Sequence, residues 1–538
     1  MAIVEEFVGK FSPQGVILAV ATLTFILLFA QWADALFRLH KLGGNSAPKI
    51  PTKLPFGMGV VYRMMEHAAK NENLELWNNF FAETGRTYTV ESRILTRRIF
   101  LTADPENIKA ILAAQFNDYG KGEAFHREWK PFLGDSIFTT DGEKWHTSRQ
   151  LIRPQFIKDR VSDLHCFEDH VATLFKCMAK GDALDGKHEK IDINMKGSDG
   201  AIIEISNLLF RYTLDVATDF LLGKDVESMC SLRQPFADAF NEVQAIQNNI
   251  ARVGPFNWLI PRGRYKACLK IINEFLNQYI ERALRLSPEE LASKTKGDRG
   301  YTFLHALASH TRDRTVLRDQ LVAVLLAGRD TTAATLSWAI YELARHPEAV
   351  NKLRQEILHT VGPTQTPTYA HLKSMKYLQN IMNETLRLYP VVPFNVRGVV
   401  HDTTLPRGGG PDGSEPIAVL KGTSISYSTL AMQRRPDLYP PVSENFADPA
   451  VFSPDRWFHW QPKPWTYIPF NGGPRICVGQ QFALTEMAYV LCRIFQRFDR
   501  IDSHMGQIDG GKPNLRSVIT LSPHDGVRVA LWRAKGGL

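Results

Sequence analysis

The side chain with the most distinctive chemistry in this sequence is the thiol of Cys477. It lies in the Gly- and Pro-rich loop Phe470-Asn-Gly-Gly-Pro-Arg-Ile-Cys-Val-Gly479, and an apolar run at helical spacing follows over residues 480–495. A helix N-terminus carries partial positive charge, and its free N–H groups can donate hydrogen bonds to a thiolate. A thiolate held in this way can serve as the proximal ligand of a haem iron.

The neighbours of Cys477 are of types that fit a flat, anionic ligand. Gly473 permits a sharp turn with positive φ, and Gly479 lets a planar macrocycle approach the backbone. Arg475 can pair with a carboxylate of that ligand, and Phe470 can shield the sulfur from water. We predict that the other five cysteines are small buried hydrophobic residues, the usual state of an isolated cysteine: Cys166, Cys177, Cys230, Cys268 and Cys492.

A second candidate is the hexapeptide Ala327-Gly-Arg-Asp-Thr-Thr332. It interrupts apolar residues that recur at helical spacing, which predicts one helix of about 44 Å over residues 317–345. A glycine followed by an acid and two hydroxyls is expected to loosen the helix locally. Asp330 and Thr331 could then relay protons to a ligand bound over the helix. Taken alone, the hexapeptide fits a solvated helix face as well.

The pattern F-x-x-G-x-R-x-C-x-G over Phe470–Gly479 resembles the haem-binding loop of cytochromes P450 at full length. The hexapeptide that ends at Thr332 resembles the motif on the central helix of the same family. The resemblance implies that Cys477 is the axial thiolate of haem b and that Thr331 and Asp330 are catalytic. It also implies a mainly α fold with a small β region and the insertion of one atom of O2 into a C–H bond.

The pair Trp145 and Arg149 acquires a role only through this resemblance. The two residues lie at i and i+4 of a predicted helix, where a simple cation–π contact is their ordinary role. In the family such a pair donates to the haem propionates, as does a residue that matches Arg397. The predicted haem-contacting residues are therefore Trp145, Arg149, Arg397, Phe470, Arg475 and Gly479.

Glu384 and Arg387 lie at i and i+3 in a helix predicted over residues 377–388. Such a pair is usually an exposed ion pair of little energetic value. Here it resembles the E-x-x-R pair of the family, which is buried with a second arginine, matched by Arg456. The implied role is structural support of the Cys477 loop. The residue before that arginine is usually Glu in the family and is Asp455 in this chain.

Two glycine patterns resemble nucleotide-binding motifs but lack the required context. Gly408, Gly410 and Gly413 fit G-x-G-x-x-G, yet no apolar strand precedes them and prolines follow. Residues 506–512 fit G-x-x-x-x-G-K, but Pro513 stands where Ser or Thr must reach magnesium. We therefore expect electrons to arrive from a separate protein, and the resemblance to cytochromes P450 implies that this donor is an NADPH-dependent flavin reductase.

The composition is that of a globular enzyme. The chain has 538 residues, of which 44% are hydrophobic and 22% charged, and no linker or repeat divides it after residue 60. The net charge of +8 is scattered, with no basic run interleaved with aromatics, so we expect no nucleic-acid partner. The unpaired spacing of the cysteines favours a reducing compartment.

Residues 11–33 contain no charged side chain and would span about 35 Å as a helix, enough to cross a bilayer. A cleaved signal peptide is the alternative, but Glu5 and Glu6 replace the basic start that such a peptide needs. Positive charge in residues 34–53 predicts that the C-terminal side faces the cytosol.

These observations predict four segments. Residues 1–10 are a short non-cytosolic N-terminus, 11–33 a transmembrane anchor, 34–58 a basic and Pro-rich linker, and 59–538 the haem-thiolate domain. The expected location is the endoplasmic reticulum membrane, crossed once, with the catalytic domain in the cytosol.

The haem loop and the central helix resemble those of the fungal subgroup that hydroxylates alkanes and fatty acids. This resemblance implies a lipophilic substrate and terminal hydroxylation of a long chain. The alternative is a tailoring oxygenase of fungal secondary metabolism. A more remote alternative is a haem-thiolate binding protein or isomerase that activates no oxygen, against which Asp330 and Thr331 argue. By their position in the family, residues 517–521 are also implied to form part of the wall of the substrate channel.

Overall fold

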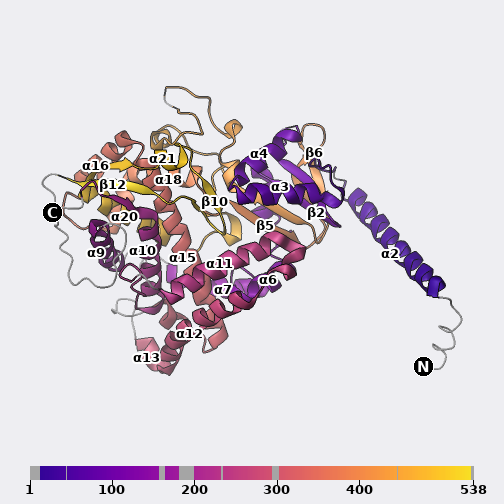
Figure 1. The fold of residues 1–538 in the computed structure, drawn as a ribbon, viewed down its shortest axis with the longest axis horizontal. Coiled ribbons are helices and arrows are strands. Elements are labelled where there is room, and N and C mark those ends of the chain that lie inside the picture. Colours follow the sequence, from indigo (N-terminus) through magenta and orange to yellow (C-terminus); the bar gives the residue numbers. More distant parts are fainter. Residues whose placement is uncertain are drawn as a thin grey trace.

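The computed structural model describes residues 13–534, apart from residues 44, 86, 157–163, 181–198, 232–233, 294–301 and 445. The fold is mainly α-helical, with a smaller β region at the end of the molecule from which the N-terminal helix projects (Figure 1). This agrees with the predicted fold class. The predicted N-terminal segment, residues 1–10, lies outside the described residues.

The helical region is built around α15 (Arg314–Leu343), a 30-residue helix that is buried along most of its length. Asp313 is the N-cap of this helix: its side chain accepts hydrogen bonds from the backbone N–H groups of Thr315 and Val316. Helices on several sides pack against α15: α6 (Glu123–Leu133), α10 (Ile205–Leu222), α12 (Gly263–Arg285), α18 (Lys376–Leu388) and α20 (Gln480–Arg497). The predictions for residues 317–345 and 377–388 are confirmed within a few residues.

The remaining helices are divided between the helical region and the β region, where the first two pack against the strand over residues 89–94. They are α3 (Met58–Ala69), α4 (Asn73–Glu83), α5 (Pro105–Lys109), α7 (Gly142–Ile152), α9 (His165–Lys180), α11 (Pro235–Val253), α13 (Pro288–Ser293), α14 (Phe303–Ala308), α16 (Pro347–Thr360), α17 (Tyr369–Ser374), α19 (Thr429–Met432) and α21 (Gly506–Asp509).

The β region contains a five-stranded sheet in the order β1-β2-β8-β5-β3. Its strands are β1 (Thr89–Ile94), β2 (Arg97–Thr102), β3 (Tyr119–Gly120), β5 (Phe394–Val399) and β8 (Ser424–Ser428). β1 and β2 pair antiparallel. The hairpin of β6 (Thr403–Gly409) and β7 (Glu415–Val419) carries Gly408, Gly410 and Gly413, each at positive φ, which confirms that these glycines form a turn.

Two smaller sheets include the C-terminal strands. β12 (Arg528–Arg533) pairs with β4 (Ile202–Glu204) and β9 (Phe498–Ser503), and β10 (Leu515–Ser517) pairs with β11 (Leu521–Pro523). The indole N–H of Trp338 on α15 donates to the Leu521 carbonyl at 3.0 Å. This bond fastens the β10–β11 hairpin to the central helix.

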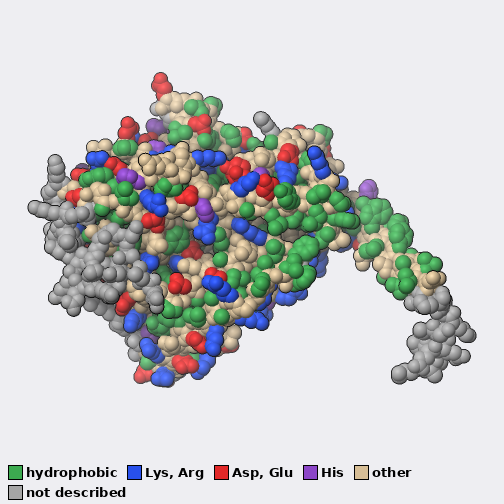
Figure 2. Space-filling model, viewed as in Figure 1, with side chains coloured by type: hydrophobic (Ala, Val, Ile, Leu, Met, Phe, Trp, Pro, Cys, Tyr) green, Lys and Arg blue, Asp and Glu red, His purple; other side chains and the backbone are tan. Residues whose placement is uncertain are grey.

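The N-terminal helix α2 (Pro13–Lys41) projects from the body (Figure 1), and its apolar side chains are exposed to their surroundings (Figure 2). Residues Ile17–Lys41 are long and apolar enough to cross a membrane by length and composition. The helix continues eight residues past the predicted anchor, since residues 34–41 are good helix formers and Arg38 pairs with Asp34 at 2.9 Å.

The segment after α2, within the linker predicted over residues 34–58, lies against the β region. Ile50 donates its backbone N–H to the Glu91 carbonyl at 2.9 Å, so the segment runs along the edge of β1. Ala47 and Ile50 are buried, with 3% and 4% exposure. The Pro-rich segment is therefore part of the packed domain.

Removing residues 1–41 should release the protein from membranes without unfolding it, because α2 has little contact with the body beyond the Arg38–Asp402 pair at 3.0 Å. We expect the truncated protein to move to the soluble fraction. The carbon monoxide difference spectrum of the reduced protein should be unchanged. Arg38→Ala in the full chain is the control and should stay in the membrane pellet. A truncated protein that remains in the pellet with an intact spectrum contradicts an anchor role for α2.

Candidate active site

The loop that carries Cys477 is fixed by backbone contacts. The Cys477 N–H donates to the Phe470 carbonyl at 3.0 Å, which closes the loop. Gly473 has φ +66°, and a Cβ there would lie 1.9 Å from the Leu112 carbonyl oxygen. The positive φ predicted for Gly473 is therefore confirmed, and the close approach to Leu112 excludes any larger residue. Gly479, the N-cap of α20, has φ −88°, so its backbone conformation is open to other residues as well.

The Cys477 side chain has accessible surface, yet the protein around it shields it from bulk water. Accessible surface together with desolvation is expected where a thiol faces a space inside the protein. Burial raises the pKa of the Cys477 thiol, while the Gly479 N–H and the charge of Arg149 act in the opposite direction. The Arg149 guanidinium donates to the Ile476 carbonyl at 3.0 Å, so it lies against the loop itself. A contact of Arg149 with haem propionates stays a prediction.

A cluster of cations lies near this loop, and among the described residues its positive charges outnumber the acidic groups beside them. Arg397 is buried and the Arg475 side chain is only 8% exposed, and burial together with these two arginines lowers the pKa of Lys121 well below its usual value. Burial likewise lowers the pKa of Arg475 to about 10, despite the opposing effect of Asp141. Asp141 accepts from Arg475, but Nε and Nη1 of Arg475 have no hydrogen-bond partner among the described residues.

Haem b carries two propionates, and the cation cluster fits them. Unsatisfied buried guanidinium N–H groups are costly, and carboxylates are their best partners. Trp145 lies at the same place, with the Arg475 guanidinium 4.7 Å from its ring centroid. The Cys477 thiol supplies an axial ligand beside this cluster. The residues present are therefore suited to hold haem.

One face of α15 has accessible surface within an otherwise buried helix. Val324, Ala327, Gly328 and Thr331 recur at the spacing of one helix face and are only partly buried. The Thr331 hydroxyl donates to the Ala327 carbonyl at 2.7 Å. The expected local loosening is absent, since α15 is α-helical throughout. Thr331 thus occupies a face that has room for a ligand.

Asp330 is buried and turned toward α11. Burial raises its pKa, against the effects of Arg329 and of a hydrogen bond with Gln244 on α11. Arg329 lies 3.5 Å from the Asp330 carboxylate and donates to Asn241, also on α11, at 2.7 Å. The interpretation of this hexapeptide as a solvated helix face is excluded, because Arg329 and Asp330 are each only 5% exposed.

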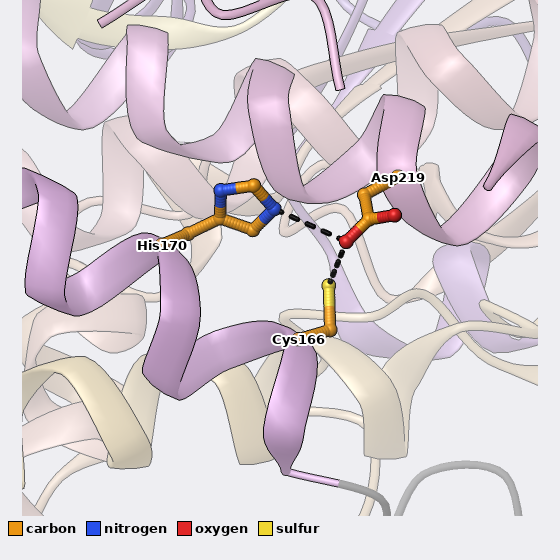
Figure 3. Close-up of side chains that lie close together, drawn as sticks. All are labelled: Cys166, His170 and Asp219. Atoms are coloured by element: carbon orange, nitrogen blue, oxygen red, sulfur yellow. Dashed lines mark hydrogen bonds and ion pairs between the residues drawn. The ribbon is translucent and has the colours of Figure 1, made fainter. Parts of the chain in front are cut away.

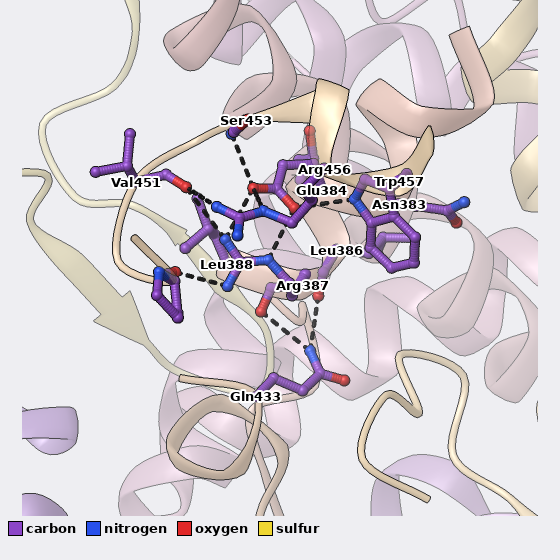
Figure 4. Close-up of polar contacts among 12 residues, drawn as sticks. Asn383, Glu384, Leu386, Arg387, Leu388, Gln433, Val451, Ser453, Arg456 and Trp457 are labelled. Carbon is purple, nitrogen blue, oxygen red and sulfur yellow. Dashed lines mark hydrogen bonds and ion pairs between the residues drawn. The ribbon is translucent and has the colours of Figure 1, made fainter. Parts of the chain in front are cut away.

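Glu384, Arg387 and Arg456 lie in direct contact, and all three side chains are fully buried (Figure 4). Both Glu384 oxygens accept from Arg387 at 2.8 Å, and Oε1 also accepts from Arg456 at 2.9 Å. Burial alone would raise the pKa of Glu384, but the two arginines hold it below its ordinary value. The remaining guanidinium N–H groups donate to backbone carbonyls of residues 447–451.

The buried ion cluster reaches the Cys477 loop through Gln433. The Gln433 amide donates to the Leu386 and Arg387 carbonyls at 3.0 and 3.1 Å and accepts from the Ile468 N–H at 3.0 Å (Figure 4 shows its amide at α18). Ile468 is two residues before Phe470, where the loop begins. The cluster therefore clamps residues 447–453 directly and supports the Cys477 loop indirectly.

Glu486 is a buried acid that sequence reasoning did not select. It lies on α20 and accepts a hydrogen bond from Thr332 on α15, so it links the helix after Cys477 to the helix of Thr331. Burial raises the pKa of Glu486 to about 8. Its Oε1 and the nearby Tyr212 hydroxyl on α10 have no hydrogen-bond partner among the described residues.

Lys121, Asp141 and Gln433 were also missed. Asp141 stands directly before the helix of Trp145, a position typical of an N-cap, and that was its only signal. Lys121 and Gln433 carry no local signal at all, because their partners are distant in the chain. The prediction that isolated cysteines are buried is right for Cys177 and Cys492 but wrong for others: Cys230 is exposed, and Cys166 and Cys268 are half-buried.

A mainly helical fold with an enclosed thiol, unbalanced cations and an acid–alcohol pair defines a haem-thiolate oxygenase. The family model described as Cytochrome P450 matches residues 48–522. A Talaromyces variabilis protein, Cytochrome P450 monooxygenase pvhE, is 57% identical, with 91% of each chain covered. Cytochrome P450 52A13 of Debaryomyces hansenii is 39% identical, covering 88% of this chain and 89% of that one. The chain belongs to the cytochrome P450 family.

Family membership makes the chain a monooxygenase. Members bind haem through a cysteine thiolate, act on lipophilic substrates with O2 and receive electrons from a reductase, typically with NADPH as the source. Cytochrome P450 52A4 of Candida maltosa, a further relative, is 40% identical, covering 85% of this chain and 83% of that one.

Glu384→Gln should prevent stable haem loading, because it leaves Arg387 and Arg456 buried without a counter-charge. Breaking a buried ion cluster in this way costs about 3–5 kcal/mol. Thermal unfolding and the reduced carbon monoxide spectrum measure the effect. Asp455→Asn is the matched control, since Asp455 is half-exposed and has, among the described residues, only two weak partners, the Lys352 ammonium at the surface and the Tyr377 hydroxyl at 3.4 Å. Equal stability of the two variants would show that the buried ion cluster does not stabilise the fold.

Glu486→Gln should stabilise the folded protein increasingly as pH rises. In the wild type, the unfolded carboxyl ionises near 4.5 while the folded one stays protonated to about 8, so stability is lost through that window. The slope is at most about 1.4 kcal/mol per pH unit. The variant has no such ionisation. We expect its advantage in thermal midpoint to widen between pH 4.5 and about 8; a constant difference contradicts the raised pKa.

Proposed function

We propose that this cytochrome P450 is a membrane-anchored monooxygenase that hydroxylates the terminal carbon of long-chain fatty acids or alkanes. The observation that carries the proposal is the enclosed Cys477 thiol beside unbalanced cations, in a chain whose α15 presents Thr331 on a partly accessible face. Haem bound at this place supplies oxygen activation and C–H oxidation. Every other task falls to side chains of this chain.

Cys477 is the proposed axial ligand, and the Phe470 carbonyl and the Gly473 turn hold its loop in position. Trp145, Arg397 and Arg475 are the proposed partners of the propionates, and Lys121 adds a further positive charge. Val478, next to Cys477, and Val324 on α15 border the same core cluster of apolar side chains, which keeps bulk water from the site. Each of these groups positions the cofactor or excludes water.

Thr331 is the proposed proton donor on the substrate side. Its hydroxyl proton is held by the Ala327 carbonyl at 2.7 Å, and rotation about χ1 would direct it to the accessible face of α15. Asp330 is the proposed source of the next proton. Its raised pKa makes it a better proton carrier at neutral pH, and the Arg329 and Gln244 contacts hold it until a side-chain rotation brings it toward the site.

The resemblance of the haem loop and central helix to fungal alkane and fatty-acid hydroxylases supports a lipid substrate. The roughly 40% identity to yeast proteins of the 52A series is in line with it. A tailoring oxygenase of fungal secondary metabolism is the second candidate. It is favoured by the 57% identity to the Talaromyces variabilis protein, a clearly nearer relative than those yeast proteins.

The proposed location is the endoplasmic reticulum membrane, with the catalytic domain on the cytosolic side and an NADPH-dependent flavin reductase as donor. Arg38, His40 and Lys41 lie at the last turn of α2, and positive charge stays on the cytosolic side of a membrane span. Phe56 and Tyr62, in the segment between α2 and α4, are exposed apolar side chains that are suited to contact lipid. A substrate dissolved in the bilayer could then enter from the membrane.

Turnover of a substrate panel tests the proposal. We expect the full chain, reconstituted with reductase and NADPH, to produce terminal alcohols from long-chain fatty acids or alkanes, identified by mass spectrometry. The lipid substrate is contradicted if none of these lipids is hydroxylated by protein whose carbon monoxide difference spectrum shows an intact thiolate ligand. If polyketide- or terpenoid-type compounds are oxidised instead, the secondary-metabolite candidate is correct. Isomerisation without O2 consumption would identify the remote alternative.

Thr331→Ala should lower product formed per NADPH by about a hundred-fold or more, since general acid catalysis typically contributes about 10²–10⁴-fold. Peroxide should rise as product falls, because electrons still arrive but proton delivery fails. Thr335→Ala is the matched control: it removes the same group one turn along α15, where the hydroxyl donates to the Thr331 carbonyl at 2.8 Å. The same loss in both variants indicates a helix defect and contradicts the proposed role of Thr331.

A further inference from the structure

A group of potential metal ligands lies outside the haem site, between α9 and α10 (Figure 3). Cys166 and His170 are at i and i+4 of α9 and therefore share one face of that helix. Asp219 reaches them from α10, and its Oδ2 lies 3.4 Å from the Cys166 sulfur and 3.3 Å from His170 Nε2. The figure shows both side chains directed at the same carboxylate oxygen.

The spacing of these atoms is close to that around a tetrahedral ion. With Zn–S of about 2.3 Å and Zn–N and Zn–O of about 2.0–2.2 Å, tetrahedral geometry places donor atoms roughly 3.3–3.6 Å apart. One donor atom from each of the three residues lies within 4.8 Å of the others. Small side-chain rotations are thus enough for all three to bind one ion, with water as the fourth ligand.

Acidic groups surround His170 on more than one element. His170 Nδ1 lies 3.7 Å from the Asp225 carboxylate, beyond the end of α10, while Nε2 faces Asp219. Metal-bound histidines usually donate the other ring N–H to a carboxylate, which orients the ring. Asp215, also near His170, already accepts the Ser228 and Met229 N–H groups, so it adds negative charge without competing as a ligand. This environment favours a cation.

We propose that Cys166, His170 and Asp219 form a binding site for a divalent ion of the zinc class that ties α9 to α10. The mixed sulfur, nitrogen and oxygen ligands suit zinc better than magnesium or calcium, which prefer oxygen alone. Binding displaces the thiol proton of Cys166 and any proton on His170 Nε2. The site is accessible for exchange, because Cys166 is half-buried and the Asp219 side chain is 35% exposed. It is independent of the proposed substrate.

Zinc binding to the haem-loaded full chain tests this site, with Cys477 blocked as a ligand by haem. After chelator treatment and zinc titration, we expect one zinc per chain by elemental analysis. Zinc-edge X-ray absorption should show one sulfur at about 2.3 Å with nitrogen and oxygen ligands. The thermal midpoint should rise on zinc addition, because the ion binds only the folded arrangement.

Cys166→Ser should abolish the sulfur signal and the thermal shift, and Asp219→Asn should lower zinc affinity at least ten-fold. Cys268→Ser is the matched control, since Cys268 is also half-buried but lies outside the group. Zinc retained equally by Cys166→Ser, or a wild-type spectrum without sulfur, means an adventitious ion only and overturns the proposal. If Cys166→Ser fails to load haem, the wild-type spectrum and Asp219→Asn decide the question.

Discussion

The buried carboxylate of Glu384 holds together parts of the chain that are far apart in sequence. It accepts hydrogen bonds from Arg387, Arg456, Trp457 and the backbone of Ser453. Since the charges are fully buried, each one depends on the others for compensation. The arginines in turn fix residues 447–451, and Gln433 carries the support to the segment before Cys477. The position of the candidate iron ligand therefore depends on an ion cluster that it does not touch.

The positive charge of the candidate haem site is balanced only when an anion is bound there. Arg397, Arg475 and Lys121 are brought together with Asp141 as the nearby acid, and burial disfavours the charged forms of Lys121 and Arg475. Two carboxylates would offset this positive charge and satisfy the unpaired Arg475 N–H groups. The protein thus holds positive charge in advance of its cofactor, which is a form of preorganisation.

The two sides of the site are joined through α15 and α20. Thr332 on α15 bonds to Glu486 on α20, while the adjacent Thr331 lies on the accessible face of α15. Trp338, further along α15, holds the β10–β11 hairpin by its bond to Leu521. Ile519 in that hairpin borders the same apolar cluster as Val324 and Val478. One helix thereby sets the places of the proposed proton donor and of the expected channel wall.

The sequence determined the features that depend on neighbours in the chain. The Cys477 loop, the Ala327–Thr332 hexapeptide, the Glu384–Arg387 pair and the apolar N-terminal helix were all recognisable from type and spacing. Residues 34–41 were the exception. Hydropathy predicted that the anchor ends at residue 33, but the helix continues to Lys41 because helix-forming residues and the Asp34–Arg38 pair stabilise it.

Only the tertiary structure decided which distant groups meet. Lys121 joins Arg397 and Arg475, Gln433 joins the ion cluster to the loop, and Cys166 with His170 meets Asp219. None of these pairings leaves a periodic trace, because each depends on how separate elements pack. Burial also depends on how the elements pack. Packing leaves Cys230 exposed and Cys177 buried, and it desolvates Glu486, which raises the pKa of that acid to about 8. Local order along the chain specifies motifs, whereas desolvation and charge balance exist only once the chain is packed.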